Sequence, residues 1–329
     1  MSDPGTDRGA VKEYPTPKCP ACGAQRWLWL LTAPDMVHRT SARTFPVLEC
    51  ESCGLGRTEL GTEPPEPGSM YPPDYVFHST LDSNGRRRSS RVSEWVARAT
   101  GSERYWRWCD SEFADFEELA RSPGRALDVG CGAGRYLGRL DALGWDVGGI
   151  EPSASAAESA RRRGFVVQTS TAEDASYPDR TLDLVTMYHS LEHCERPEVA
   201  VGRAIGALKP GGVIAIALCN FDSPGRRFFG PFWPMLELPR HRYHFGPRSV
   251  TRLLEGFGAR VEGVYYHNDL TVVPAALEYM ARRRNRRDER PFPSGTARIG
   301  TALTLTYAPL LRMAGLSLRA AFLVRARRD

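Results

Sequence analysis

Residues 125–267 alternate between short apolar runs and stretches whose apolar residues have helical spacing. The apolar runs read RALDVG, WDVGGIEP, FVVQTS, LDLVTMY, GGVIAIALCN and ARVEGVYYH. The stretches between them, such as RYLGRLDALG and SASAAESARRRG, often end in glycine, as helices do at their C-caps. Strands that alternate with helices favour a parallel sheet covered by helices on both faces. The sequence therefore predicts a doubly wound, Rossmann-like α/β fold, with RAAFLVRARR as its last strand.

The rest of the chain divides into smaller parts, separated by changes in composition. We predict a disordered tail, a metal-binding module, a linker with N-terminal helices and the α/β domain, at residues 1–17, 18–62, 63–124 and 125–329. Within the α/β domain, two long connections are interpreted as insertions, at residues 221–246 and 270–316.

Composition limits the classes of protein to which this chain can belong. Hydrophobic residues make up 41% and charged residues 25%, which allows a sizeable core. No apolar run reaches the roughly 18 residues of a membrane span, and the first residues lack the apolar segment of a secretory signal. We therefore expect a cytoplasmic protein whose cysteines are thiols or metal ligands. The net charge of +5 comes from arginines interspersed with acids, so charge alone does not indicate a nucleic-acid binder.

Two CxxC pairs lie in the predicted module. They can supply four thiolates to one tetrahedral Zn²⁺, from Cys19, Cys22, Cys50 and Cys53. A glycine follows each pair and lets the turn tighten, so that backbone N–H groups face the sulfurs. Four thiolates leave no open coordination position, so we expect a structural zinc in a zinc-ribbon-like module. Four free or redox-active thiols are the alternative.

The segment LDVGCGAGRYL runs from an apolar strand into three glycines and then a helix. Gly130, Gly132 and Gly134 permit a tight turn and a close approach of the backbone to a ligand at the helix N-terminus. The spacing G-x-G-x-G differs from the dinucleotide pattern G-x-G-x-x-G and argues against a dehydrogenase. Glu151 ends the next strand, where a carboxylate can accept hydrogen bonds from ribose hydroxyls.

An ordered set of segments now resembles a known family. ALDVGCGAG, GIEPS, TAEDASYPDRTLDLV, HSLEH and LKPGG together resemble the class I S-adenosylmethionine-dependent methyltransferases over residues 120–265. With the double CxxC and the segment MYPPDY, the likeness is nearest to bacterial sugar, polysaccharide and natural-product methyltransferases and to relatives of the ubiquinone-type enzymes. The resemblance implies a seven-stranded methyltransferase sheet and S-adenosylmethionine as the cofactor.

The same resemblance implies roles for individual residues. Asp128 and the three glycines would hold the amino-acid end of the cofactor, and Glu151 its ribose. Further contacts are implied along the adenine, from Thr171, Ala172 and Glu173. Tyr71 and Tyr75 match a tyrosine pair that can close over the active site in the sugar enzymes, although packing within the linker would also explain them.

The segment MYHSLEH contains H-x-x-E-H, which is also the spelling of the inverzincin metalloprotease motif. That motif requires one continuous helix, whereas here a strand precedes it and Pro197 follows soon after. His189, Glu192 and His193 instead follow a strand of the predicted sheet, at the edge where ligands bind. We interpret them as catalytic candidates, with a histidine as general base. Capping of the next helix and packing beneath the cofactor are the alternatives.

A second aromatic cluster, FFGPFWPMLELPRHRYHF, lies on the same predicted edge. Long connections inside compact domains are usually functional, so we expect a lid over the acceptor, with His241 or His244 as an alternative base. A surface patch that packs on the N-terminal module would also produce this composition.

The predicted activity is transfer of a methyl group to a small sugar-like or natural-product acceptor, with oxygen favoured over carbon and nitrogen. An RNA-base methyltransferase is the main alternative, because some rRNA enzymes also join a cysteine-rich module to this fold. Against it, the fourth strand ends in YHSLEH rather than in the N/D-P-P-Y of many base-flipping enzymes. A non-catalytic cofactor-binding module is a further alternative. Residues 281–316 join a basic cluster to an apolar stretch. We favour an additional helix that covers a sheet face or a dimer partner, with contact at the inner membrane face as the alternative.

Overall fold

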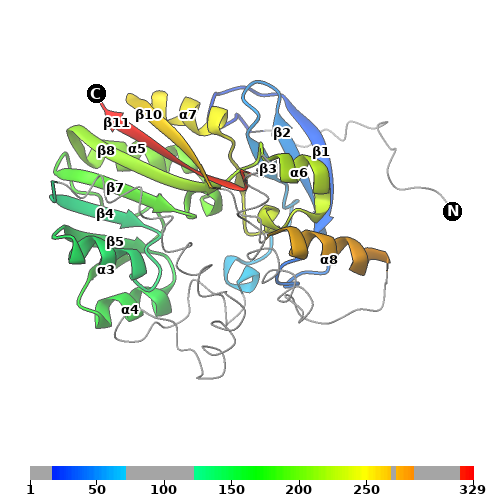
Figure 1. Ribbon diagram of the computed structural model, residues 1–329, viewed down its shortest axis with the longest axis horizontal. Coiled ribbons are helices and arrows are strands. Elements are labelled where there is room, and N and C mark those ends of the chain that lie inside the picture. The colour runs from blue at the N-terminus through cyan, green and yellow to red at the C-terminus, as the bar shows by residue number, and fades with distance from the viewer. Residues whose placement is uncertain (1–16, 72–121, 268–271, 285–318) are drawn as a thin grey trace, which may run out of the picture.

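The computed structural model describes residues 17–71, 122–267, 272–284 and 319–329. Its main body is one seven-stranded sheet in the order β10-β11-β8-β7-β4-β5-β6 (Figure 1). The five central and edge strands that run parallel to one another are β4 Arg125–Val129, β5 Asp146–Glu151, β6 Val166–Thr169, β7 Leu182–Tyr188 and β8 Leu208–Cys219. The predicted doubly wound methyltransferase-type sheet is confirmed.

The sheet is mixed rather than wholly parallel. β11 Ala321–Arg328 inserts between β8 and β10 Ala259–His267 and runs antiparallel to both. The final strand predicted from RAAFLVRARR is therefore present.

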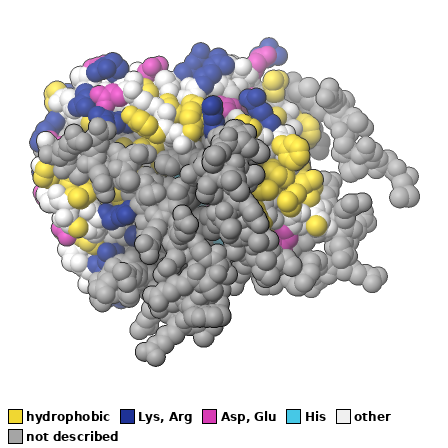
Figure 2. Space-filling model, in the orientation of Figure 1, with side chains coloured by type: hydrophobic (Ala, Val, Ile, Leu, Met, Phe, Trp, Pro, Cys, Tyr) yellow, Lys and Arg dark blue, Asp and Glu magenta, His cyan; other side chains and the backbone are white. Residues whose placement is uncertain are grey.

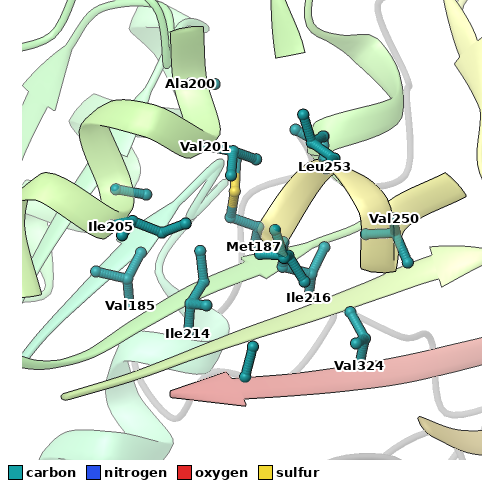
Figure 3. Packing of buried hydrophobic residues seen from close by; sticks show 14 of the residues in the cluster. Val185, Met187, Ala200, Val201, Ile205, Ile214, Ile216, Val250, Leu253 and Val324 are labelled. Carbon is teal, nitrogen blue, oxygen red and sulfur yellow. The ribbon is translucent and has the colours of Figure 1, made fainter. Parts of the chain in front are cut away.

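Side chains of successive strand residues point to opposite faces, and each face has its own helices. On one face, Ile214 and Ile216 of β8 pack with α5 Pro197–Ala207 and α7 Pro247–Glu255, together with Val185 and Met187 of β7 (Figure 3). On the other face, Ala215 and Ala217 pack with Tyr136 and Leu140 of α3 Arg135–Ala142. α4 Ala154–Arg162 joins α3 and β6 through Ala157 and Ala160. Because alternate residues of each strand face opposite sides, the sheet is covered by an apolar layer on each face.

The strand order reverses between β4 and β7. From β4 the chain moves outward through β5 to β6 and then returns to place β7 on the other side of β4. Ligands of open α/β sheets bind at this switch point, beyond the carboxyl ends of the strands. The loops after β4 and β7 therefore form the centre of the candidate site.

A second sheet of four strands lies beside the first (Figure 1). Three strands come from the N-terminal region, namely β1 Trp27–Pro34, β2 Thr44–Cys50 and β3 Gly56–Thr58. The fourth is β9 Tyr243–His244, which comes from the connection after β8 and pairs antiparallel with β3. The N-terminal module is thus joined to the α/β domain through backbone hydrogen bonds.

The connection at 221–246 is built from short pieces. They are α6 Pro224–Phe229, the 3₁₀ turns η5 Gly230–Phe232 and η6 Pro234–Leu236, and then β9. Phe221, Phe229 and Trp233 pack with Phe45 and Val47 of β2, and α8 Val272–Arg284 adds Ala276 to the same cluster. The aromatic residues of this connection are therefore largely core residues. Its role as a lid stays a prediction.

Several predictions fall on parts of the chain outside the described residues. They are the tail at 1–16, Tyr75 and the helices of the linker, and most of the 270–316 insertion. The proposed domain boundaries stay predictions. Among the described residues, no helix is long and apolar enough to cross a membrane.

Candidate functional site

Two loops at the switch point interlock. Gly130, Gly132 and Gly134 have φ values of 83°, 54° and 78°, a backbone conformation that side chains with a Cβ adopt rarely. A Cβ on Gly130 would lie 2.4 Å from the Cβ of Ser190, which follows β7. The Ser190 hydroxyl donates to the carbonyl oxygen of Val129 at 2.7 Å. Glycine is therefore required at 130, because the loops after β4 and β7 meet there.

Two buried carboxylates flank the glycine loop. Glu151 accepts hydrogen bonds from the backbone N–H groups of Gly132 and Ser153, both at 2.8 Å. Asp128 accepts one from the Thr186 hydroxyl at 2.7 Å. Both carboxylates are buried, and no ion pair with either is found among the described residues. A ligand that brings positive charge and hydroxyl groups fits this pair of acceptors.

Burial and the nearby charge of Glu151 together raise the pKa of Asp128 to about 7, against a partial lowering by the Thr186 hydroxyl. Burial likewise raises the pKa of Glu151. Because the folded chain holds a proton on Asp128 up to about pH 7 and the unfolded chain only to about 3.8, the folded state without ligand loses stability as pH rises between these values.

Replacement of Asp128 by asparagine tests whether the Asp128 charge destabilises the ligand-free fold. Since each unit of pKa shift corresponds to about 1.4 kcal/mol, we expect Asp128→Asn to stabilise the ligand-free protein by up to about 4 kcal/mol at pH 8 and by clearly less at pH 5. Thermal melting at the two pH values measures the difference. A melting temperature that moves equally at both pH values would show that the Asp128 charge is not the cause.

The three residues predicted along the adenine lie after β6. Glu173 is buried, and its carboxylate accepts hydrogen bonds from the backbone N–H groups of Glu195 at 2.7 Å and Arg196 at 3.1 Å. Ala172 accepts a hydrogen bond from the Tyr177 hydroxyl. Thr171 donates to Asp174. Glu173 thus fixes the loop that follows His193, and its carboxylate is used within the fold.

His189 lies directly after β7, as the sequence indicated. Its backbone has a φ of 46°, and its Nδ1 atom lies 3.2 Å from Oε1 of Glu192. Cys219, the last residue of β8, places its sulfur 3.8 Å from the same Nδ1. Glu192 lies in the short turn η4 Leu191–His193 and is buried, whereas His189 is partly exposed. His189 and Glu192 thus lie in contact, and Cys219 from the neighbouring strand lies close to the same ring nitrogen.

His193 has a different environment. Its Nδ1 atom lies 3.2 Å from the Tyr71 hydroxyl and 3.2 Å from the carbonyl oxygen of Arg240. A carbonyl oxygen can only accept, so this contact places the proton of neutral His193 on Nδ1 and leaves a lone pair on Nε2. The ring of His241 packs edge-on against His193, with 4.8 Å between the ring centroids. Tyr71 therefore contacts a histidine at this edge of the sheet, and its role over the active site stays a prediction.

His241 and His244 are both buried in the connection after β8. Burial lowers the pKa of His241 to about 4, although Glu237 raises it in part. Burial also lowers the pKa of His244 well below its usual value. The Thr58 hydroxyl donates to the carbonyl oxygen of His241 and therefore accepts from Nε2 of His244, at 2.9 Å. His244 thus holds β9 against the N-terminal module.

A buried ion pair joins the same connection to the module. The Arg240 guanidinium donates to both carboxylate oxygens of Asp35, at 2.8 and 3.1 Å, and both side chains are fully buried. Arg240 also donates to the carbonyl oxygen of Met70 at 3.0 Å and to Glu237 at 3.2 Å. One side chain therefore connects the module, the segment before Tyr71 and the 221–246 connection.

The four module cysteines converge as predicted. The sulfur of Cys19 lies 3.5 Å from that of Cys53, and the sulfur of Cys22 lies 3.7 Å from that of Cys50. All four are free thiols, and their sulfurs lie within 4.8 Å of one another. Tetrahedral Zn²⁺ with Zn–S bonds of about 2.3 Å needs sulfur separations of about 3.8 Å, so the cluster fits that ion. Backbone N–H groups of the two turns face Cys19 and Cys50.

Comparison with known proteins decides the class. Residues 101–264 match the protein family described as "Methyltransferase domain". The chain contains an S-adenosylmethionine-dependent methyltransferase domain. The match confirms the resemblance to S-adenosylmethionine-dependent methyltransferases that the sequence motifs indicated.

Curated relatives of the methyltransferase domain are named ubiquinone biosynthesis O-methyltransferases. One from Rhodopseudomonas palustris is 29% identical over 142 residues, which covers 40% of this chain and 56% of the relative. One from a Bradyrhizobium species is 32% identical over 162 residues, covering 44% and 64%. The chain thus matches about three fifths of the length of these relatives. A solved S-adenosylmethionine-dependent methyltransferase from Archaeoglobus fulgidus is 20% identical, with a TM-score of 0.48, and the match covers 68% of this chain and 94% of that one.

Three features of the structure were not anticipated from the sequence. They are the approach of Cys219 to His189, the Asp35–Arg240 ion pair and the pairing of β9 with β3. A signal existed for Cys219, since GGVIAIALCN ends at the same sheet edge as LDLVTMY. No local signal links Asp35 with Arg240, because their contact spans 205 residues.

Proposed function

We propose that this chain transfers a methyl group from S-adenosylmethionine to an oxygen of a small sugar-like, polysaccharide-precursor or natural-product acceptor. The observation that carries the proposal is the glycine loop with Asp128 and Glu151 at the switch point of a methyltransferase sheet. The preference for oxygen draws on the relatives named O-methyltransferases.

Residues of the chain would bind the cofactor at the first loop. Asp128 and the glycine loop would hold its amino-acid end, and Glu151 would accept from the ribose hydroxyls. When bound, S-adenosylmethionine supplies an electrophilic methyl group on a sulfonium. The positive charge would compensate the two carboxylates, which burial destabilises.

His193 is proposed as the base that takes the proton from the acceptor hydroxyl. The Arg240 carbonyl and the Tyr71 hydroxyl both face Nδ1, so Nε2 carries the lone pair. His241 and His244 are less suited, because both are buried and burial lowers their pKa values. The edge-on ring of His241 would instead hold the His193 ring in place.

The position of the N-terminal module supports a small acceptor over RNA. The edge of β3 is occupied by β9 of the same chain, and Arg240 is used in an internal ion pair. Among the described residues that Figure 2 shows uncovered, Asp and Glu side chains lie beside several of the Lys and Arg side chains. The module is therefore proposed to shape the acceptor side of the site.

Calorimetry with S-adenosylmethionine tests the cofactor, and a screen of acceptors with a labelled methyl donor tests the reaction. At saturating cofactor, His193→Gln should lower kcat by about 10²–10⁴-fold, the usual contribution of a general base, without weakening cofactor binding. Glu151→Gln should instead weaken cofactor binding, with a smaller effect on kcat at saturating cofactor. Absence of detectable cofactor binding by the wild-type protein would reject the proposed function.

A further inference from the structure

Three side chains from different elements converge beside the proposed methyl-transfer site. His189 follows β7, Glu192 lies in η4 and Cys219 ends β8. Their ligand atoms, Nδ1, a carboxylate oxygen and Sγ, all lie within 4.8 Å of one another. This cluster, the His189–Glu192–Cys219 cluster, shares no residue with the four module cysteines.

Hydrogen bonding satisfies the cluster only weakly. The Nδ1 atom of His189 faces both Oε1 of Glu192, at 3.2 Å, and the sulfur of Cys219, at 3.8 Å. If neutral His189 donates from Nδ1 to Glu192, the sulfur of Cys219 faces that N–H group and can share its proton only as a weak acceptor. If the thiol donates to Nδ1, the carboxylate oxygen faces that nitrogen's lone pair.

Glu192 also has an unpartnered atom. Its side chain is 2% exposed, and its Oε2 atom is buried without a hydrogen-bond partner among the described residues. A buried carboxylate oxygen without a partner is costly, because its hydration is lost and nothing replaces it. A cation that accepts electron pairs from all three side chains at once removes both difficulties.

We propose that His189, Glu192 and Cys219 bind one divalent transition-metal ion, of the Zn²⁺ type. Metal–ligand bonds of about 2.0–2.3 Å in a tetrahedral site place ligand atoms about 3.3–3.6 Å apart, close to the separations at Nδ1. A thiolate and an imidazole favour a borderline or soft ion over Mg²⁺, which prefers oxygen ligands.

The cluster leaves room for a further ligand. A small cavity is lined by Glu192, Cys219 and Asn220 together with residues of the 221–246 connection, including Met235 and His241. Three protein ligands and one open position are the arrangement of zinc sites that act in catalysis, whereas the four-thiol cluster is closed. The ion would therefore polarise an acceptor oxygen that enters the cavity. That role rests on the proposed function, whereas binding of the metal does not.

Metal content tests the proposal without an acceptor. The full-length protein is saturated with Zn²⁺, desalted and analysed by mass spectrometry for zinc. We expect about two ions per chain in the wild type, and about one in Cys219→Ala and in His189→Ala, since each variant keeps the four module thiolates. Cys219→Asp, which restores an anionic ligand, should regain the second ion at least in part.

Cys194→Ala is the matched control, because Cys194 is a buried free thiol outside both clusters and should leave about two ions in place. Thermal melts followed by circular dichroism identify variants that lose the fold along with the metal, and Cys219→Asp supplies a second variant in that case. One ion in the wild type, or two in both Cys219→Ala and His189→Ala, would overturn the proposal. Neither result would touch the proposed function, which is tested by cofactor binding.

Discussion

Replacing Arg240 by methionine should lower the free energy of unfolding by about 3–5 kcal/mol at pH 7, the usual cost of leaving a buried charge without its partner. Methionine has a similar volume, so the loss comes from the charge. Asp35 is fully buried and would keep only the hydrogen bonds from His38 and Thr40. Urea unfolding followed by tryptophan fluorescence measures the change.

The loss should depend on pH in a defined direction. Despite the opposing effect of burial, Arg240 holds the pKa of Asp35 below its ordinary value of 3.8. Wild-type Asp35 thus contributes stability that is present above that value and lost at lower pH. In the variant, burial without Arg240 raises the Asp35 pKa, so the variant loses stability as pH rises. The difference between the two proteins should widen from pH 4 to pH 7.

Arg125→Met is the matched control. Arg125 pairs with Asp146 at 3.3 Å, but the two side chains are 54% and 74% exposed. An exposed pair of this kind contributes at most about 1 kcal/mol. Equal losses in the two variants would contradict the special cost assigned to the buried pair.

Disruption of the four-thiol cluster should have the other large effect. Structural zinc contributes about 10–16 kcal/mol of binding free energy to small domains that fold around it, so Cys53→Ser should unfold the N-terminal sheet. Because β9 pairs with β3 and His244 bonds to Thr58, the loss should spread to residues 234–245 of the lid. The glycine loop has no such contact and should stay folded.

Hydrogen exchange read by mass spectrometry checks this pattern. We expect rapid exchange at residues 27–58 and 234–245 in Cys53→Ser, with protection retained at 125–151. Cys194→Ser serves as the control for a buried thiol outside the cluster. If the lid keeps its protection while the module loses it, the proposed coupling between them is wrong.

Local patterns were sufficient for much of the fold. The alternation of apolar runs with helical stretches predicted the strands of the main sheet, since burial on both faces requires continuous apolar runs. The glycine loop was located for a similar reason, because its conformation depends on residues within one turn. The four cysteines converge, as two CxxC pairs of this kind predict, because each pair is held within one tight turn.

Contacts between distant segments could not be read in the same way. The sequence placed His189 and Glu192 together because they are three residues apart, but the third member, Cys219, comes from the next strand of the sheet. Nothing in the sequence indicated that backbone N–H groups at 195 and 196 donate to the Glu173 carboxylate, whose place along the adenine stays a prediction. Such pairings depend on how loops pack in three dimensions, which residue spacing along the chain does not encode.

The short strand β9 has a consequence for chimeric enzymes. Acceptor loops are commonly exchanged between related enzymes to change their substrate, on the assumption that a loop is a self-contained cassette. Here residues 221–246 complete the sheet of the N-terminal module and fill its core. An exchange that transfers this segment without residues 17–71 would separate β9 from β3 and Arg240 from Asp35. The smallest unit that can be transplanted with its contacts is therefore discontinuous in sequence.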